Sequence, residues 1–274
     1  AEAIREVLLA DRADKRWSTI GQSFGGFLTL SYLSFAPQSL RDSRITAGLA
    51  PIRTSVDNVY QHTFDRMKER VEEYYSWFPE DAELATRIAE HLRTHKEYLP
   101  TGERLTDHRF QMAGHFLGGR WRERGLHYFL ENAFAEGNDH LSDQFLTAMG
   151  AEVTFQANPL YALMHETIYA DGPSDGVLPG IPGYTISPSP APTNWSAARV
   201  AASRPEFAPD ADRLLFTGEH IFPWYYEEDP SLRPLAEVAN ILAEKKDWGR
   251  LYDHEQLHKN EVPVVAAAYN PDVY

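Results

Sequence analysis

The residues best suited to chemistry lie in the stretch Gly21–Gly26, GQSFGG, where one serine stands between glycines. This stretch matches the G-x-S-x-G pattern, in which a strand, a sharp turn and a helix present the hydroxyl of a nucleophilic serine. The short apolar run 17–20 precedes it, and a run with helical apolar spacing follows it and stops at Pro37. We therefore predict that Ser23 is a nucleophile at a helix N-terminus, where free N–H groups favour developing negative charge.

The neighbours of this serine have predicted roles in the same turn. Gly21 and Gly25 are expected to let backbone segments pack more closely than a Cβ would allow. The backbone N–H of Phe24 is expected to be one of two donors that stabilise an oxyanion. The same residues are also compatible with a glycine-rich helix start, in which Ser23 only caps the helix.

A nucleophilic serine needs a general base, and the base needs an orienting carboxylate. Asp272 follows the uncharged, β-branched run 262–270, which predicts a buried strand that ends in a turn. The carboxyl end of a parallel strand is a usual place for a site residue, although Asp after Asn-Pro is also a common turn residue. None of the 11 histidines follows Asp272. We therefore expect the base to be missing from this chain and the chain alone to have little or no activity.

The histidines within the chain are assigned structural roles. His254 and His258 precede the predicted strand and are expected on a solvated helix or loop. His165 and His220 each adjoin a glutamate and are expected to be core residues or hydrogen-bonding partners. We expect no metal and no other cofactor.

The order of elements predicts an α/β fold. Strands and helices alternate through the first fifty residues, with a second strand in the run 44–51, which implies a parallel sheet covered on both faces. Apolar spacing then becomes helical, with one stripe through Met67, Val71, Tyr74 and Phe78 and another through Leu84, Ile88 and Leu92. We divide the chain into a core with the serine turn at 1–52, a mostly helical cap at 53–215, and the cap end with the return to the core at 216–274.

Two later segments carry further expectations. Residues 231–246 predict a helix with Leu235, Val238, Ile241 and Leu242 facing inward. Residues 172–195 are dense in Gly and Pro, so they are either a surface loop or a lid over a site.

Composition excludes several classes of protein. The 274 residues are 43% apolar and 24% charged, as in an ordinary globular protein. A net charge of -14 argues against a nucleic-acid partner. No apolar run is long enough for a membrane helix and the N-terminus lacks the features of a signal peptide, so we expect no membrane association. With 0 cysteines there is no disulfide framework and no thiolate, which fits a cytoplasmic location.

A family resemblance is carried by six stretches together: GQSFGGF (21–27), RITAGLAP (44–51), HETIY (165–169), TNW (193–195), LLFTGEHIFPWYYE (214–227) and VPVVAAAY (262–269). The sequence resembles the prolyl aminopeptidases, or proline iminopeptidases, which are serine peptidases of the α/β-hydrolase superfamily. It is most similar to their longer bacterial branch with an enlarged cap, most densely in residues 1–52 and 155–274. The resemblance implies a partial α/β-hydrolase sheet with a large, mostly helical cap. It also implies release of N-terminal proline from peptides through an acyl-enzyme, without a cofactor.

The resemblance implies roles for individual residues. Ser23 would be the nucleophile and Asp272 the triad acid. Glu166 and Glu219 would be the cap glutamates that hold the free amino terminus of the substrate, because a desolvated ammonium needs a paired carboxylate. Without the resemblance, both are interpreted as exposed helix glutamates. The aromatic residues near them either line an apolar proline pocket or belong to the core: Tyr161, Trp195, Phe222 and Trp224.

Some family features are not found in these residues. The family has an upstream His-Gly-Gly-Pro-Gly loop, which supplies the other oxyanion donor, further sheet strands and a downstream catalytic histidine. We therefore expect an unpaired edge on the strand at 17–20 and interpret the chain as the interior of a longer enzyme. Two alternatives remain: an esterase or epoxide-type hydrolase on the same scaffold, or a binding protein that kept the cap and lost the base.

Overall fold

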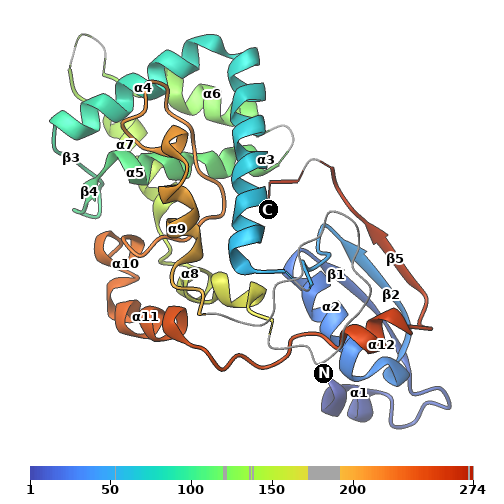
Figure 1. Cartoon of the computed structure of the whole chain (residues 1–274). Helices are drawn as coiled ribbons and strands as arrows, with labels where there is room; N and C mark the ends of the chain where they lie inside the picture. Colours follow the sequence, from blue (N-terminus) through green and yellow to red (C-terminus); the bar gives the residue numbers. More distant parts are fainter. Residues whose placement is uncertain are drawn as a thin grey trace. The chain divides into compact units, whose positions relative to one another are not determined.

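The chain forms two compact units in the computed structural model (Figure 1). The structure describes residues 1–52, 54–119, 122–135, 137, 139–171, 192–270 and 272–273. The first unit comprises Ala1–Ser55, Ile168–Pro192 and Lys245–Asn270; the second comprises Val56–Thr167, Thr193–Glu244 and Pro271–Tyr274. Most of the predicted loop or lid at 172–195 lies outside the described residues, and the division at residues 52 and 215 stays a prediction.

The first unit contains a small parallel sheet, as predicted. Its elements are α1 (Glu2–Leu8), β1 (Trp17–Gln22), α2 (Phe24–Phe35), η1 (Pro37–Ser39), β2 (Leu40–Thr46), α12 (His254–His258) and β5 (Val264–Ala267). The strand order is β1-β2-β5, and both neighbouring pairs are parallel. The second strand occupies Leu40–Thr46 rather than 44–51, because it begins directly after the turn at Pro37. In the described part of the chain, β1 pairs only with β2, so it is an edge strand as expected.

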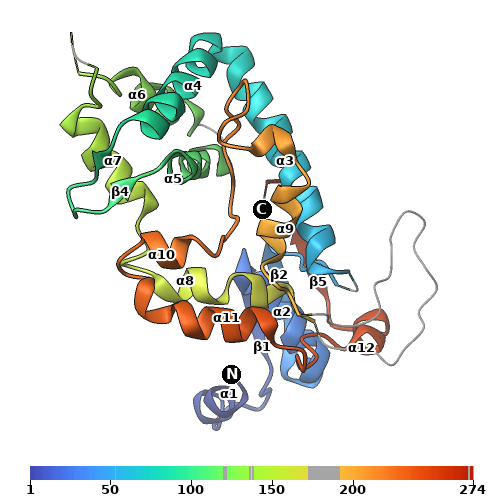
Figure 2. The same cartoon turned by 60° about the vertical axis from the view of Figure 1, so that its left-hand side comes forward.

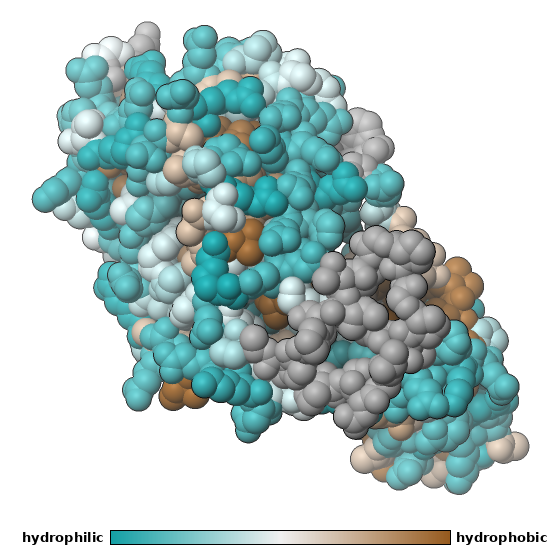
Figure 3. Space-filling view, in the orientation of Figure 1, coloured by the Kyte–Doolittle hydropathy of each residue, from teal (hydrophilic) through white to brown (hydrophobic). Residues whose placement is uncertain are grey.

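Among the described residues of the first unit, only one face of this sheet is covered by a helix. Helix α2 packs on β1 and β2, where Leu33 of the helix and Ile45 of the sheet are buried. On the other face Ile20 is 77% exposed, and all four residues of β5 are exposed, Val265 to 71%. The expectations of a sheet covered on both faces and of a buried strand within 262–270 are therefore wrong for the described chain. Figure 3 shows hydrophobic surface in this part of the first unit.

The second unit is mainly helical (Figures 1 and 2). Its helices and short strands are α3 (Val56–Trp77), α4 (Pro79–Thr94), β3 (Glu97–Tyr98), β4 (Arg104–Leu105), α5 (Asp107–Phe110), η2 (Gln111–Gly118), α6 (Glu123–Glu131), α7 (Asp143–Val153), α8 (Pro159–Met164), α9 (Ser196–Ala202), η4 (Pro205–Phe207), α10 (Tyr225–Glu228), η5 (Arg233–Leu235) and α11 (Ala236–Glu244). The predicted stripes on α3 and α4 are confirmed for their fully buried members Met67, Val71, Tyr74, Ile88 and Leu92. Phe78, which follows the end of α3, and Leu84 are only half-buried, so their predicted burial is wrong. None of the helices in the described ranges has the length and hydropathy of a membrane span.

Helix α11 is shorter than predicted and turned differently. It begins at Ala236, and Ile241 is 60% exposed while Ala239 and Ala243 are buried. The inward orientation expected for Val238 and Ile241 is therefore wrong. The alanines face inward because the chain at residues 193–194 lies directly against this helix, where the Asn194 N–H donates to the Ala243 carbonyl at 2.9 Å. Small side chains permit this close approach.

Residues 214–220 cross the helical unit without forming helix or strand, and we call them the buried segment. Apart from half-buried Glu219, its residues are buried. A buried chain without regular structure must find other partners for its N–H and C=O groups. The Tyr75 hydroxyl donates to the Leu214 carbonyl at 2.8 Å, and the Gln111 side-chain amide donates to the Leu215 carbonyl at 2.8 Å.

Candidate active site

Ser23 lies exposed at the sharp junction between β1 and α2. Its φ of 52° and ψ of -125° place it in the left-handed φ region, which is strained for a residue with a Cβ. Its N–H donates to the Thr46 carbonyl at 2.9 Å, and its carbonyl accepts the Gly26 N–H at 2.8 Å. The Ser23 side chain makes no capping hydrogen bond to α2, which contradicts the interpretation of this serine as a simple helix cap.

Three glycines permit this strained turn. A Cβ on Gly21 would lie 2.2 Å from the Gly25 carbonyl oxygen, and one on Gly26 would lie 2.2 Å from the Gly48 oxygen. A Cβ on Gly48 would lie 2.1 Å from the Ser23 oxygen. The expectation of close packing is therefore confirmed for Gly21 but wrong for Gly25, around which the described residues leave open space. Gly26 and Gly48 were not predicted from the sequence, although the Gly-Gly pair at 25–26 is a signal that could have identified Gly26.

Phe24 opens α2 immediately after the serine. The first N–H groups of a helix have no acceptor within the helix, so the Phe24 N–H is a donor of the kind an oxyanion needs. The Phe24 side chain is half exposed and contacts Phe27 edge-on, with ring centroids 6.2 Å apart.

Glu166 is a buried carboxylate in the second unit. It opens the short helix η3 (Glu166–Tyr169), is 7% exposed, and its Oε1 accepts the Ala197 N–H at 3.0 Å. Burial raises the pKa of this carboxyl, and the hydrogen bonds from Ala197, Thr193 and Ser196 oppose that rise. The exposure expected without the resemblance is therefore wrong.

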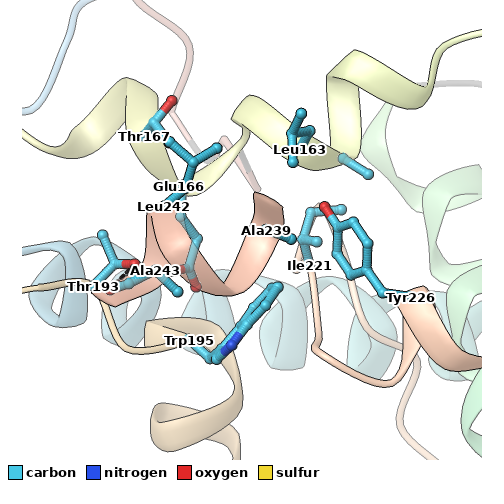
Figure 4. Close-up of a pocket in the computed structure, with 11 residues that line it drawn as sticks. Leu163, Glu166, Thr167, Thr193, Trp195, Ile221, Tyr226, Ala239, Leu242 and Ala243 are labelled. Carbon is cyan, nitrogen blue, oxygen red and sulfur yellow. Dashed lines mark hydrogen bonds between the residues drawn. The ribbon is translucent and has the colours of Figure 1, made fainter. Parts of the chain in front are cut away.

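The Glu166 carboxylate lies in a pocket between α8, α9 and α11 (Figure 4). Its lining is mostly apolar and comprises Ala162, Leu163, Glu166, Thr167, Thr193, Trp195, Ile221, Tyr226, Ala239, Leu242 and Ala243. Trp195 and Tyr226 form an aromatic wall with ring centroids 5.5 Å apart. Trp195 has a φ of 57°. Its indole N–H donates to Asn240 Oδ1 at 3.0 Å, which fixes the ring.

The other aromatic candidates lie elsewhere. Phe222 is buried and stacks on Trp224 with centroids 5.5 Å apart, so these two residues form packing contacts outside the Glu166 pocket. Tyr161 is partly exposed and hydrogen-bonds to Glu219.

Glu219 lies on the buried segment, which is not helical. The interpretation of Glu219 as a helix residue, made without the resemblance, is therefore wrong. Burial raises the pKa of its carboxyl, and the negative charge of Asp272 raises it further, while the hydrogen bond from Tyr161 opposes both. The structure thus brings Glu219 and half-buried Asp272 together. It does not place Glu219 in the lining of the Glu166 pocket.

The histidines near these glutamates are core residues, as predicted, because His165 and His220 are almost fully buried. His254 lies on α12 but is buried, so its expected exposure is wrong. Its Nε2 lies 2.8 Å from Asp171 Oδ2, and this hydrogen bond accompanies its burial.

The chain also contains a metal-binding pattern that was not predicted from the sequence. Residues 254–258, HEQLH, have the H-E-x-x-H spacing of zinc peptidases. The structure does not bring these residues together as ligands of one metal, because His254 is buried and hydrogen-bonded to Asp171, whereas His258 is exposed.

One group in the described ranges has ligand atoms close enough to hold a metal, namely Glu80, Asp81 and His127. Asp81 accepts hydrogen bonds from the Tyr74 hydroxyl and from His127 Nδ1, the latter at 3.0 Å. These hydrogen bonds account for the approach of His127 to Asp81, and Glu80 is exposed, so we assign no metal to the group.

Comparison with known proteins gives the same family as the sequence motifs. The chain is 41% identical to a proline iminopeptidase of Aeromonas sobria, over all of this chain and 59% of the relative. It is 33% identical to the proline iminopeptidase aneH of Aspergillus aculeatus, over all of this chain and 58% of that protein. The chain thus spans less than two thirds of the length of these relatives. No family model matches it. The resemblance expected from the motifs is confirmed: along its whole length, this chain is a homologue of the proline iminopeptidases.

Proposed function

We propose that the protein containing this chain is a serine aminopeptidase of the α/β-hydrolase fold that releases proline from peptides with a free N-terminal proline. The observation that carries this proposal is Ser23, exposed at a strained φ of 52° between a parallel strand and a helix. Such a turn holds a hydroxyl away from the chain, where a substrate carbonyl can approach it. The names of the two relatives support the choice of proline.

In the proposed reaction, Ser23 Oγ attacks the carbonyl carbon of the N-terminal proline while a general base takes its proton. The bond to the next residue breaks, that proton passes to the leaving amine, and an acyl-enzyme remains. Water then hydrolyses the ester and releases proline. The Phe24 N–H would stabilise the oxyanion in both steps. Asp272 would orient a histidine base.

The cap carboxylates explain a preference for a free amine. Glu166 is buried with one oxygen on the Ala197 N–H, so its ionised form is stabilised when a substrate ammonium binds beside it. The apolar lining around it suits the pyrrolidine ring. Glu219 would be the second carboxylate. An N-acylated proline has no charge to offer and leaves the buried carboxylate unpaired. A cytoplasmic location, favoured by the lack of cysteine, belongs to the same proposal.

The test is hydrolysis of proline arylamides by the intact protein. We expect cleavage of the free proline arylamide, no cleavage of its N-acetyl form, and loss of activity in Ser23→Ala. An esterase on the same scaffold would accept an acylated or amine-free ester equally well. Equal rates on free and N-acetylated substrates would overturn the peptidase proposal.

A further inference from the structure

The buried segment delivers Glu219 to its position without any regular structure of its own. The Leu214 N–H donates to Thr86 Oγ1 at 3.1 Å, and the Thr217 N–H donates to the Gln111 carbonyl at 3.0 Å. A Cβ on Gly114 would lie 2.0 Å from the Thr217 carbonyl oxygen, so the segment lies directly on η2. Together with the Tyr75 hydroxyl on the Leu214 carbonyl, these contacts fix residues 214–217 from three elements of the helical unit, α3, α4 and η2.

His220 continues this arrangement on the other side of Glu219. Its Nδ1 accepts the Gly218 N–H at 3.0 Å, and its Nε2 lies 3.0 Å from Thr63 Oγ1. Because Nδ1 accepts, the proton of the neutral ring must be on Nε2, which donates to Thr63. The Thr63 hydroxyl donates in turn to the Tyr60 carbonyl at 3.2 Å. Each of the three donors in this series, the Gly218 N–H, His220 Nε2–H and the Thr63 hydroxyl, has an acceptor. The ring therefore has one orientation and one tautomer.

Packing holds the His220 ring in the same orientation. It is fully buried and stacks on Phe64 with centroids 3.8 Å apart and planes 13° from parallel. Burial lowers the pKa of His220 well below its usual value, which keeps the ring neutral. A protonated Nδ1 would confront the Gly218 N–H with a second donor.

Two further histidines hold the backbone around Glu219. His115 hydrogen-bonds to the backbone of Gly218, and His165 hydrogen-bonds to the backbone of Glu219 itself. Burial lowers the pKa of both rings to about 4, so they too are neutral near pH 7. The imidazoles of His115, His165 and His220 therefore fix the turn from Gly218 to His220.

We propose that His220, fixed by Thr63, is a positioning residue that holds Glu219 at the site where it meets the substrate amine. The role of Glu219 in this statement rests on the proposed function, whereas the fixed geometry of the Gly218–His220 turn does not. The hydroxyl of Thr63 is the remote end of the arrangement, and it touches neither glutamate in the contacts described above.

The variant Thr63→Val tests this proposal in the intact protein, because it replaces the hydroxyl by a methyl group of similar size. Thr63→Ser is the matched control, since it keeps the hydroxyl. The loss of one hydrogen bond behind Glu219 should raise KM for a proline arylamide roughly five-fold, with kcat little changed. Labelling of Ser23 by a fluorophosphonate, which needs no amine site, should keep its wild-type rate. Thr63→Ser should restore KM.

Two NMR measurements decide the positioning claim without enzyme activity. The ¹⁵N shifts of His220 should show the neutral Nε2–H tautomer at pH 7 in the wild type. In Thr63→Val the Nε2 shift should change, because Nε2–H loses its acceptor while Nδ1 still accepts the Gly218 N–H. The carboxyl ¹³C titration of Glu219 should show a pKa above the usual value in the wild type, and a lower pKa in Thr63→Val as the side chain gains access to water.

The outcomes separate the two proposals. If wild-type protein does not cleave proline arylamides, the proposed function fails while the NMR results still support or overturn the positioning role. If Thr63→Val leaves KM, the His220 Nε2 shift and the Glu219 titration unchanged, the positioning role is overturned. A fall in kcat and in Ser23 labelling with unchanged KM would also overturn it, because that pattern indicates general destabilisation.

Discussion

Replacing Gly21 by alanine should disrupt the serine turn, whereas replacing Gly25 should not. The new Cβ at Gly21 would lie 2.2 Å from the Gly25 oxygen and 2.7 Å from Thr29 Oγ1. These neighbours cannot yield easily, because Thr29 Oγ1 donates to that same Gly25 oxygen at 2.8 Å and so fixes the first turn of α2. Carbon and oxygen in ordinary contact are more than 3 Å apart, so the strand and helix would have to separate by about 1 Å.

Overpacking of this kind typically costs 1–3 kcal/mol, and a clash with backbone falls at the upper end. We expect Gly21→Ala to lower the free energy of unfolding by about 3 kcal/mol. Gly25→Ala is the matched control, since a Cβ there meets nothing within 4 Å in the described structure. It replaces glycine inside a helix and should raise the same free energy by up to about 1 kcal/mol.

Urea denaturation of the intact protein measures both changes. With a slope of about 3 kcal/mol per molar, the midpoint of Gly21→Ala should fall by about 1 M and that of Gly25→Ala should rise slightly. Fluorophosphonate labelling of Ser23 should slow in the first variant and not in the second. Equal midpoints for the two variants would refute the steric reasoning.

Three further predictions concern the carboxylates and histidines of the helical unit. Glu166→Gln keeps an acceptor for the Ala197 N–H but loses the charge, so it should raise KM for proline arylamides at least about ten-fold without moving the urea midpoint. Glu166→Ala should raise KM too and should also lower the free energy of unfolding by about 1 kcal/mol. An unchanged KM in both variants would contradict the role of the charge. Asp272→Asn should lower the Glu219 pKa seen by ¹³C NMR, because it removes the negative charge that raises it; an unchanged titration would contradict the predicted interaction. Burial lowers the pKa values of His115, His165 and His220 below 6.5 in the folded state, so the unfolded chain binds more protons at low pH. The free energy of unfolding should therefore fall as the pH drops from 6.5 toward 4, by up to about 1.4 kcal/mol per pH unit for each histidine. Urea midpoints that do not change between pH 7 and 5 would contradict this.

Features encoded by neighbouring residues were predicted well from the sequence. The position of Ser23 follows from a strand, a glycine-bounded turn and a helix that are all local. The stripe through Met67 and Val71 follows from helical periodicity, which also needs no knowledge of distant residues. The choice between Gly25 and Gly26 was harder, because neighbouring positions on a helix point about 100° apart and only the path of β2 decides which one meets Gly48.

Features that depend on distant contacts were predicted poorly. Val265 has the composition of a core strand, yet its burial depends on what covers the sheet, and the described chain leaves it exposed. Ile241 lies on the exposed side of α11, because residues 193–194 pack against the opposite side of this helix, which carries the alanines. His254 is buried by an interaction with Asp171, 83 residues away in sequence. No local pattern contains such information.

The buried segment has a consequence for hydrogen exchange. Amides in irregular chain usually exchange quickly, since water reaches them without unfolding. The Thr217 and Gly218 N–H groups are instead bonded to Gln111 and His220 inside the helical unit, so they should exchange only when that unit opens. Their protection should equal that of amides in the middle of α3. A one-residue insertion between 214 and 220, which a surface loop would tolerate, should here be as harmful as an insertion in the middle of that helix.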